Sequence, residues 1–437
     1  MITHHAGDDY DKMIRGDPGM EDIYHWGPEG QNVHTRGRTG TGDGVHVLTG
    51  PIYVCGAEQG DVLKVEILDL RPRVNPSTGK TYGSNAAANW GYQFRAGFLD
   101  GKPREVVTIY EILRDETGNI TWAVPDYQFQ YGNYLEDGKT NANGYQGPST
   151  YCLPTEGGYG DTGPNLLANW TNANDEFKNL SVPCVNGQQQ FSGLYYPGII
   201  TKHPTGTEDY SIRGKFRVPV NFHIGNMILA AATNYTVDSV PPSVFGGNID
   251  NRRIGKGATM YYPVQVPGAL LSMGDAHTAQ GNSEFDGTGI ETSINGDFRI
   301  TLLKADELPI EAEDLTFPLL ENDNEWVVHG FTYANYLNEL DTPFKTVYAD
   351  STLDRAMTVA YNNTRDFMMR SFDLTEDQAI SAITLVVDFE VTQVVDGNWG
   401  IHTVIPKWPF TNSTEQFSPT VFPGSSKPAE VTMLTTI

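Results

Sequence analysis

The segment GDAHTAQGNSE at residues 274–284 holds the densest group of side chains that could do chemistry. Asp275 and His277 lie two positions apart, so on an extended chain both side chains point to the same face. A carboxylate and an imidazole that converge are natural ligands for a divalent metal ion, with zinc as the expected ion and calcium as the alternative. Glu284 is then a further ligand, or the general base that acts on metal-bound water. The alternative is a hydrogen-bonded turn whose histidine is structural.

A second polar cluster is FGGNIDNRR at residues 245–253. Asn248 and Asp250 are also two positions apart and share a face if this segment is extended. The Asp250 carboxylate can ligate a metal ion or orient a histidine, and a neighbouring arginine can hold a carboxylate through two hydrogen bonds. Taken alone, the cluster is also typical of an Asx-type turn beside a surface ion pair.

His46 follows a glycine-rich loop at the edge of a predicted strand, which makes it a further candidate metal ligand beside Asp250, Asp275 and His277. His223 lies within an apolar strand segment, where a histidine is usually a hydrogen-bonded core residue. The candidate substrate-binding side chains are the amides of Asn248, Gln280 and Asn282.

These clusters need a rigid scaffold, and the pattern around them predicts strands. The chain has 46 glycines and 26 prolines, a density that suits short strands and turns better than long helices. Alternating or continuous apolar segments predict strands within residues 46–70, 104–131, 216–231, 260–275 and 298–304. The 274–284 cluster directly follows one of these strands, where a scaffold would present a loop.

Two helices are predicted near the C-terminus. Residues 351–370 carry apolar side chains at helical spacing, with Met357 expected in the buried stripe. The sequence Thr-Glu-Asp-Gln at 375–378 is a capping box that begins a second helix through about Ile383. Residues 385–395 then predict a long buried strand.

Composition excludes several classes of function. The chain of 437 residues carries 54 acidic and 29 basic side chains, a formal net charge of −25 that disfavours binding to nucleic acids and anionic membranes. No apolar run approaches the length of a membrane span. The three cysteines are too few for a disulfide scaffold, although Cys152 and Cys184 are a candidate pair.

We expect two parts in the chain. Residues 1–237 form a β-rich N-terminal part with an irregular insert at about 136–190, and residues 238–437 form a β-rich catalytic part with the two helices. The insert is long enough to be a lid or a subunit contact, with a plain surface loop as the alternative. A cytoplasmic location is expected, with a secreted or periplasmic one as the alternative if an N-terminal leader has been trimmed.

Four motifs, in this order, resemble the acetamidase/formamidase family: HVLTGPIYVCGAEQGDVLKVEILDL, GGNIDNRR, VPGALLSMGDAHTAQGNSEFDGTGIE and VTQVVDGNWGIHTVIPK. The resemblance runs from about residue 4 to residue 410. It implies a mainly β, β-sandwich-like fold with a smaller α+β part, and a homo-oligomer. It also implies hydrolysis of short linear amides, such as formamide or acetamide, to a carboxylate and ammonia.

The chain departs from the family pattern at two positions near Glu284. Where the family often has Gln-Gly-Asp-Gly-Glu-Val-Cys-Gly, residues 280–287 read QGNSEFDG, so Asn282 replaces a carboxylate and Asp286 replaces a cysteine. The first change predicts a difference in substrate choice or metal affinity. Two alternatives to a short-amide hydrolase therefore stay open, namely a binding module that keeps the scaffold and an enzyme for larger amides.

Overall fold

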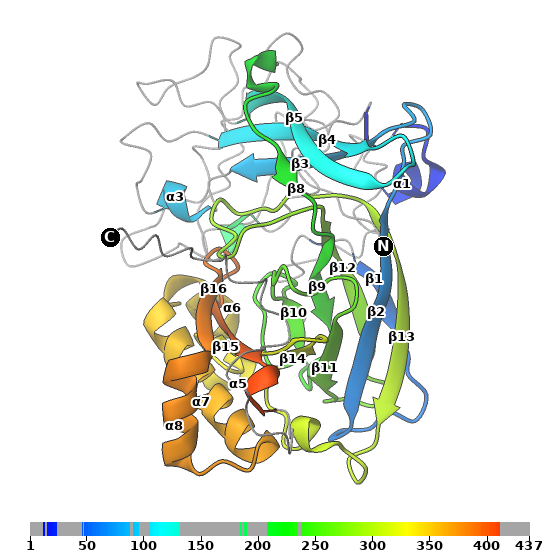
Figure 1. Cartoon of the computed structure of the whole chain (residues 1–437). Helices are drawn as coiled ribbons and strands as arrows, with labels where there is room; N and C mark the ends of the chain where they lie inside the picture. Colours follow the sequence, from blue (N-terminus) through cyan, green and yellow to red (C-terminus); the bar gives the residue numbers. More distant parts are fainter. Residues whose placement is uncertain are drawn as a thin grey trace, which may run out of the picture.

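The computed structural model describes residues 12–13, 15–23, 46, 48–87, 91–95, 105–131, 184–185, 188–189, 208–234 and 237–410 (Figure 1). The predicted fold class is confirmed, because fifteen strands in three sheets dominate this part of the chain and helices are few. The predicted insert at 136–190 lies outside the described residues except for two two-residue strands, β6 (Cys184–Val185) and β7 (Gln188–Gln189). Cys152 of the predicted Cys152–Cys184 pair lies outside them as well, so the pair stays a prediction.

Sheet 1 has four antiparallel strands in the order β1-β12-β9-β10. Their bounds are Leu48–Ile52 for β1, Leu271–His277 for β12, His223–Ile228 for β9 and Gly246–Asn248 for β10. Both polar clusters of the sequence therefore belong to one sheet, since β12 ends in one cluster and β10 leads into the other.

Sheet 2 is the larger one, with seven strands in the order β13-β2-β11-β14-β15-β17-β16. Their bounds are Ile294–Leu303 for β13, Val62–Pro72 for β2, Thr259–Pro263 for β11, Leu319–Glu321 for β14, Glu325–Phe331 for β15, Gly400–Pro406 for β17 and Asp388–Gln393 for β16. Strands from both sides of residue 237 pair with one another, as β2 does with β11 and β13. The boundary at residue 237 stays a prediction.

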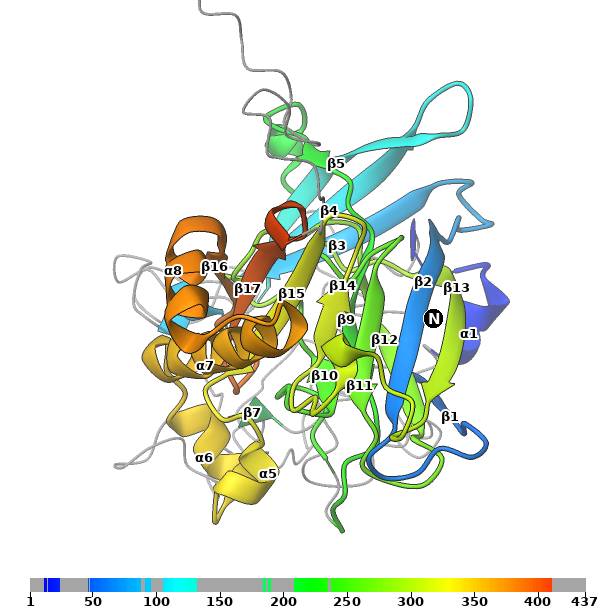
Figure 2. The same cartoon turned by 60° about the horizontal axis from the view of Figure 1, so that its bottom comes forward.

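Sheets 1 and 2 pack face to face as a sandwich (Figure 2). Alternate residues of β2, among them Leu63 and Val65, share one buried cluster with Met260 of β11 and with Leu271 and Met273 of β12. The side-chain period of two in a strand produces this arrangement, because alternate residues of each strand face the partner sheet. The packed sandwich is the rigid base on which the polar ends of β9, β10 and β12 are fixed.

Sheet 3, in the order β3-β4-β5-β8, projects from the sandwich beyond the ends of β9 and β12 (Figure 1). Its bounds are Thr81–Ala87 for β3, Glu105–Arg114 for β4, Ile120–Tyr131 for β5 and Val218–Pro219 for β8. Glu291 joins the two sheets, since its backbone forms bridges to both Ser84 of β3 and His277 of β12.

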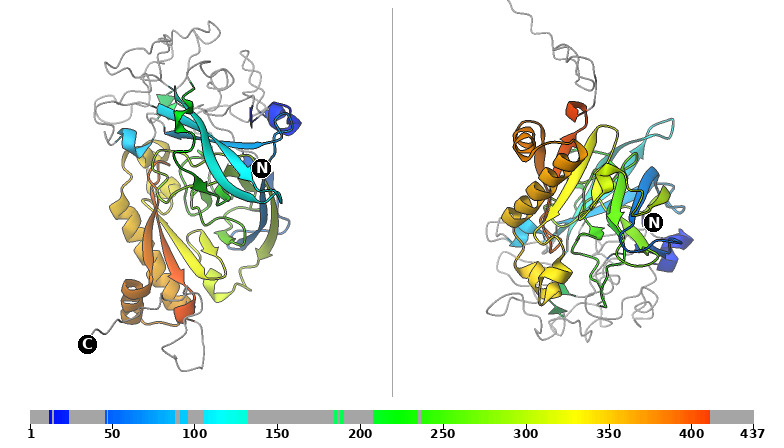
Figure 3. Two further views of the ribbon diagram at one scale, coloured as in Figure 1. Left: turned by 45° about the horizontal axis from the view of Figure 1, so that its top comes forward. Right: turned by 90° about the horizontal axis from the view of Figure 1, so that it is seen from below.

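Helices cover one end of sheet 2, where α7 and α8 lie beside β15, β17 and β16 (Figures 2 and 3). The helix bounds are Pro18–Ile23 for α1, Tyr92–Arg95 for α3, Tyr336–Glu339 for α5, Pro343–Ala349 for α6, Leu353–Ser371 for α7 and Glu376–Val386 for α8. The predicted capping box is present, because the Thr375 hydroxyl accepts from the Gln378 N–H and the Gln378 side chain accepts from the Thr375 N–H. No helix in the described part of the chain combines the length and the apolar character needed to cross a bilayer.

Two details of the C-terminal prediction are wrong. Met357 is 41% exposed, because α7 turns Ala356, Ala360 and Phe367 toward the sheet and leaves Met357 at the edge of its buried face. The residues predicted to begin a strand at 385 instead complete α8, which runs to Val386, and β16 begins only at Asp388. A short apolar run fits either structure, and here the capped helix upstream continues through it.

Candidate active site

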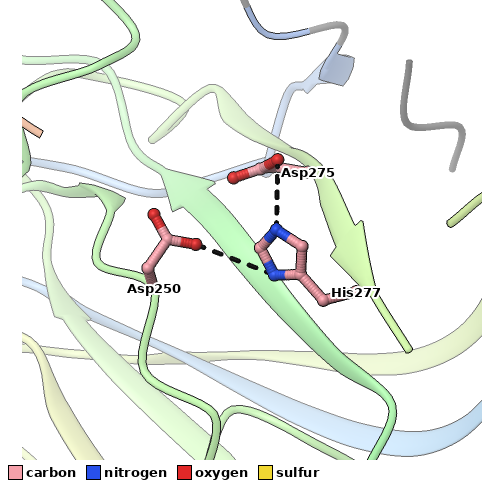
Figure 4. Close-up of side chains that lie close together, drawn as sticks. All are labelled: Asp250, Asp275 and His277. Carbon is pink, nitrogen blue, oxygen red and sulfur yellow. Dashed lines mark ion pairs between the residues drawn. The ribbon is translucent and has the colours of Figure 1, made fainter. Parts of the chain in front are cut away.

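The polar ends of sheet 1 form a buried site in which Asp250, Asp275 and His277 converge (Figure 4). His277 Nδ1 lies 3.7 Å from Asp250 Oδ1, and His277 Nε2 lies 3.5 Å from Asp275 Oδ1. His46 is at the edge of the same group, with Nε2 3.6 Å from Asp275 Oδ2. Thus all four predicted metal ligands lie in one place, although their sequence positions span more than half of the chain.

Gly225 of β9 makes room for this convergence. It lies opposite Asp275 between the paired positions of β12 and β9, and its carbonyl accepts a hydrogen bond from the Asp250 N–H at 3.1 Å. A Cβ at Gly225 would lie 2.4 Å from Asp250 Oδ1, 2.5 Å from Asp275 Oδ2 and 2.6 Å from His277 Cε1. The absence of a side chain there leaves a small cradle that is faced by the two carboxylates.

A second group of carboxylates shares Asp250 with the first. Ligand atoms of Asp250, Glu284 and Asp396 all lie within 4.8 Å of one another, and all three residues are buried. Glu284 reaches this position because its loop is fixed to β16, with Ser283 N donating to Thr392 O at 2.9 Å and Val394 N donating to Ser283 O at 3.2 Å. Asp396 lies three positions after the end of β16, so this strand helps to position both carboxylates.

The backbone at three of these carboxylates is in the left-handed region. The φ angles are 53° at Asp250, 53° at Asp275 and 42° at Glu284. Such conformations cost an L-residue roughly 1 to 3 kcal/mol, and they concentrate at functional sites because the surrounding structure must impose them. Aspartate tolerates this region better than most residues and has it also at Asp314 and Asp373 outside the site, so Glu284 is the position that side-chain chemistry has to explain.

A hydrogen bond fixes the tautomer of His223, and His277 lies between His223 and a carboxylate. His223 Nδ1 donates to the Asn221 carbonyl oxygen at 2.7 Å, which leaves Nε2 as an acceptor 3.2 Å from His277 Nδ1. His277 Nε2 in turn lies 2.9 Å from Glu291 Oε1. Burial, together with the neighbouring His277, lowers the pKa of His223 to about 3, so His223 is neutral.

The electrostatics of the site favour a cation at its centre. Burial alone would lower the pKa of His277, but Glu291 and Asp275 outweigh it and raise that pKa well above the usual value. Burial alone would raise the pKa of Asp275, but His46 and His277 hold it well below the usual range. The same carboxylates that retain a proton on His277 would attract a divalent ion.

The second group of carboxylates, formed by Asp250, Glu284 and Asp396, favours the protonated form, whereas Asp275 favours the ionised form. Burial raises the pKa values of Asp250 and Glu284 well above their usual range, and neighbouring carboxylates add to the effect. Burial also raises the pKa of Asp396 to about 7. Charges of one sign this close cannot all ionise without a positive partner, so the group holds protons until a cation replaces them.

Several buried atoms of the site have no hydrogen-bond partner among the described residues. They are Asp250 Oδ1 and Oδ2, Glu284 Oε2, Asp396 Oδ2 and His277 Nε2, whose approach to Glu291 is not aligned for a hydrogen bond. Buried polar groups are normally paired, so such a concentration of unpaired polar atoms indicates a place for a bound ion or substrate.

A cavity of about 560 Å³ adjoins the site between sheet 3 and residues 279–290, and Glu284 lies in its wall. We call it the 279–290 cavity. Two of the three predicted substrate-binding residues, Gln280 and Asn282, line it as well. The third, Asn248, does not lie among its described lining residues but is buried in β10, two positions before Asp250.

Gln280 and Asn282 are held by neighbours of the site. Gln280 Nε2 donates to the Asp250 carbonyl oxygen at 2.9 Å, which leaves its buried Oε1 without a partner among the described residues. The Asn282 amide donates to Glu390, whose carboxylate also receives two hydrogen bonds from Arg253 at 2.9 and 3.1 Å. Arg253 and Asp250 belong to the same polar cluster at residues 245–253. This one segment therefore holds Gln280 directly and Asn282 through Glu390.

Sequence reasoning missed Asp396 and Glu291 and placed His223 in the core without a role. Asp396 and Glu291 lie within two of the motifs that carry the family resemblance, which was the available signal. The sequence pattern alone could not assign Asp396 and Glu291 to the site, because the contacts between β12, β16 and the 279–291 loop are set by the tertiary fold.

The sequence pattern that defines the acetamidase/formamidase family matches residues 39–131 and 216–410, which include every residue of this site. The chain belongs to the acetamidase/formamidase family. Relatives of the chain include an acetamidase of Mycolicibacterium smegmatis, 29% identical over 260 residues, which are 59% of this chain and 54% of the relative. A formamidase of Methylophilus methylotrophus is 27% identical over 268 residues, which are 60% of this chain and 52% of the relative.

This member of the acetamidase/formamidase family thus spans about half the length of the curated relatives it matches. Among solved structures, an acetamidase from Bacillus halodurans superposes with a TM-score of 0.50 at 19% identity, covering 83% of this chain and 79% of that one. The superposition supports the family fold.

Proposed function

We propose that the protein is a metal-dependent amidohydrolase that cleaves linear amides to a carboxylate and ammonia. The family membership and the relatives named acetamidase and formamidase support the reaction class. The observation that carries the proposal is the convergence of Asp250, Asp275 and His277 around the cradle at Gly225. The unpaired acceptor atoms of Glu284 and Asp396 lie in a second group that shares Asp250 with the first. Zinc as the ion, a homo-oligomer and a cytoplasmic location stay predictions.

The residues at the end of sheet 1 fit a divalent cation. Asp250, Asp275 and His277 offer ligand atoms within 4.8 Å of one another, His46 is in reach of Asp275, and the cradle beside Gly225 lies among them. Two carboxylates and one or two imidazoles form a donor set that suits zinc. A bound ion would supply Lewis acidity and lower the pKa of a water molecule.

Glu284 is the candidate proton-transfer group. It is buried, its Oε2 has no hydrogen-bond partner among the described residues, and it lies in the wall of the 279–290 cavity. Burial raises its pKa well above the usual value, which brings a carboxylate closer to the basicity that water activation requires. Glu284 would take a proton from the attacking water and deliver it to the departing nitrogen, because ammonia leaves readily only after protonation.

Gln280 and Asn282 are the candidate groups that orient the substrate amide. Both line the cavity beside Glu284, and the free Oε1 of Gln280 can accept a hydrogen bond from a substrate N–H. Hydrogen bonds to Asp250 and Glu390 restrain the two side chains, so substrate binding would cost them little conformational freedom.

Glu284→Gln tests the proposal. Removing the proton acceptor should lower turnover of formamide and acetamide by about 100- to 10,000-fold. The metal content per chain should stay near that of the wild type, because Asp250, Asp275 and His277 remain. Elemental analysis and an ammonia-release assay measure the two quantities.

The matched control is Glu307→Gln, at an exposed position on the turn after β13. It should behave as the wild type in both assays. Full turnover in Glu284→Gln would refute the role of Glu284. Absence of ammonia release from any amide by the metal-loaded wild type would favour the alternative of a binding module.

A further inference from the structure

The 279–290 cavity is larger than a short amide requires. Acetamide has four heavy atoms, and with about 30 Å³ per water-sized group it fills on the order of 100 Å³. The cavity measures about 560 Å³, which is within the range of sites for ligands of drug size, about 300 to 1,000 Å³. Most of the cavity would be unused by formamide or acetamide.

The two walls of the cavity differ in chemistry. Sheet 3 contributes apolar surface from Val106, Tyr110 and Val218, and the opposite wall contributes the carboxylates of Glu284 and Asp286. None of the described residues that line the cavity is a lysine, an arginine or a histidine. The cavity is therefore suited to a ligand with an apolar body and a positive or hydrogen-bond-donating group, and it disfavours anions.

The Asp286 carboxylate is held by neutral donors only. Asn85 Nδ2 lies 3.3 Å from each of its oxygens, a long and divided contact, and the backbone N–H groups of Thr288 and of Asp286 itself also donate to it. Among the described residues, no basic side chain pairs with Asp286. Burial raises the pKa of Asp286 although these hydrogen bonds lower it, so the carboxylate still lacks a positive partner.

Glu284 adds a second, independent sign that the cavity receives a ligand. Its side chain is only 5% exposed, and its Oε2 has no hydrogen-bond partner among the described residues. Glu284 and Asp286 are two positions apart in one loop and line the same cavity. A substrate held at both would have its amide beside Glu284 and a donor group beside Asp286.

We propose that Asp286 is a specificity-determining residue that binds a protonated amine at the far end of an extended amide substrate. The substrate class is then an amino-carboxamide, with an ammonium group, a short apolar chain that contacts sheet 3 and a terminal primary amide. The inference rests on the proposed amide hydrolysis and names its substrate class. The bonds broken and formed are those of ordinary amide hydrolysis, since Asp286 only binds.

A length series of substrates tests the inference. Amides with two to five methylene groups between an ammonium group and the carboxamide are compared with neutral alkyl amides of equal heavy-atom count, at a pH where the amine is charged. We expect kcat/KM for at least one amino-carboxamide to exceed that of its neutral counterpart by about tenfold or more, as for a charge-assisted hydrogen bond. In Asp286→Asn this ratio should fall about tenfold.

Asp297→Asn is the control, because it removes one negative charge from an exposed position on β13 outside the cavity. It should keep both the ratio and the absolute rates of the wild type. The thermal midpoint of Asp286→Asn should stay near that of the wild type, since the asparagine Oδ1 can still accept the hydrogen bond from Asn85. If Asp286 has only a structural role, the substitution should instead lower the thermal midpoint and reduce kcat/KM equally for the charged and the neutral amide.

The outcomes separate this inference from the proposed function. Hydrolysis of acetamide with equal rates for charged and neutral long amides would overturn the role of Asp286 and leave amide hydrolysis standing. If no amide is hydrolysed, calorimetric titration of wild type and Asp286→Asn with 6-aminohexanamide and hexanamide decides. Binding of the charged amide that depends on Asp286 supports the inference, and equal or absent binding overturns it.

Discussion

Gly225→Ala provides a direct test of the metal site, because it adds one methyl group and removes no ligand. The new Cβ would lie 2.4 Å from Asp250 Oδ1, 2.5 Å from Asp275 Oδ2 and 2.6 Å from His277 Cε1. Ordinary contact begins at about 3.5 Å, so each group has to move by roughly 1 Å. Metal–ligand distances tolerate about 0.2 Å, so the displaced groups no longer form a working donor set.

The expected effects follow from that displacement. Metal affinity, measured by competition with a chelator, should fall by at least about 100-fold, and so should ammonia release at saturating metal. Overpacking should also lower the free energy of unfolding by about 1 to 3 kcal/mol. Circular dichroism and thermal unfolding establish that the variant is folded before either assay is interpreted.

Gly330→Ala is the matched control for overpacking. Gly330 is on β15, and its added Cβ would lie 2.2 Å from the backbone nitrogen of Ala360 in α7, outside the metal site. This variant should be destabilised at least as much as Gly225→Ala and yet keep its metal affinity in the folded state. If Gly225→Ala binds metal and turns over substrate as the wild type does, the ion is not held by Asp250, Asp275 and His277.

Three further outcomes are expected. Treatment with a chelator should abolish ammonia release and lower the thermal midpoint, and both should return when the ion is restored, because an ion that binds only the folded state stabilises it. Glu390→Gln should raise KM several-fold with a smaller change in kcat, because Asn282 and Arg253 lose the charged partner that fixes them, and steady-state kinetics measure the split. Asp61→Asn tests pH dependence: burial alone would raise the pKa of Asp61, but Lys304 at 2.6 Å and two backbone N–H groups lower it. The stabilisation is therefore fully present above the unfolded pKa of about 3.9 and is lost as the pH falls through the lower folded value. The free energies of unfolding of the wild type and Asp61→Asn, measured with urea, should differ strongly at pH 7 and little near pH 2.

The sequence was most informative where local pattern and tertiary packing agree. Alternation in residues 62–70 predicts a half-buried strand, and β2 has that form because its apolar residues face sheet 1. The capping box at Thr375 predicts the start of α8 because the cap is a local hydrogen-bond arrangement. The end of α8 and the orientation of Met357 were not predictable, since the packing of α7 and α8 on sheet 2 decides them.

The site was predictable to the extent that its residues cluster in sequence. Asp275 and His277 share a strand end, and their proximity follows from spacing. Asp396 is far along the chain and reaches the site only because the 283 position pairs with Gln393 of β16. A contact of that range has no local signature, so Asp396 could be recognised only as part of a motif.

The left-handed backbone at Asp250, Asp275 and Glu284 has a consequence for how this lineage can change. Glycine is the residue best suited to such φ angles, and asparagine tolerates them better than most. Aspartate shares that tolerance and glutamate does not, so a descendant released from selection for catalysis should drift to glycine, asparagine or aspartate at position 284 and become more heat-resistant as it does so. The amino acid found at this position in a homologue would then indicate whether its chemistry is still maintained, independently of how well its overall fold is preserved.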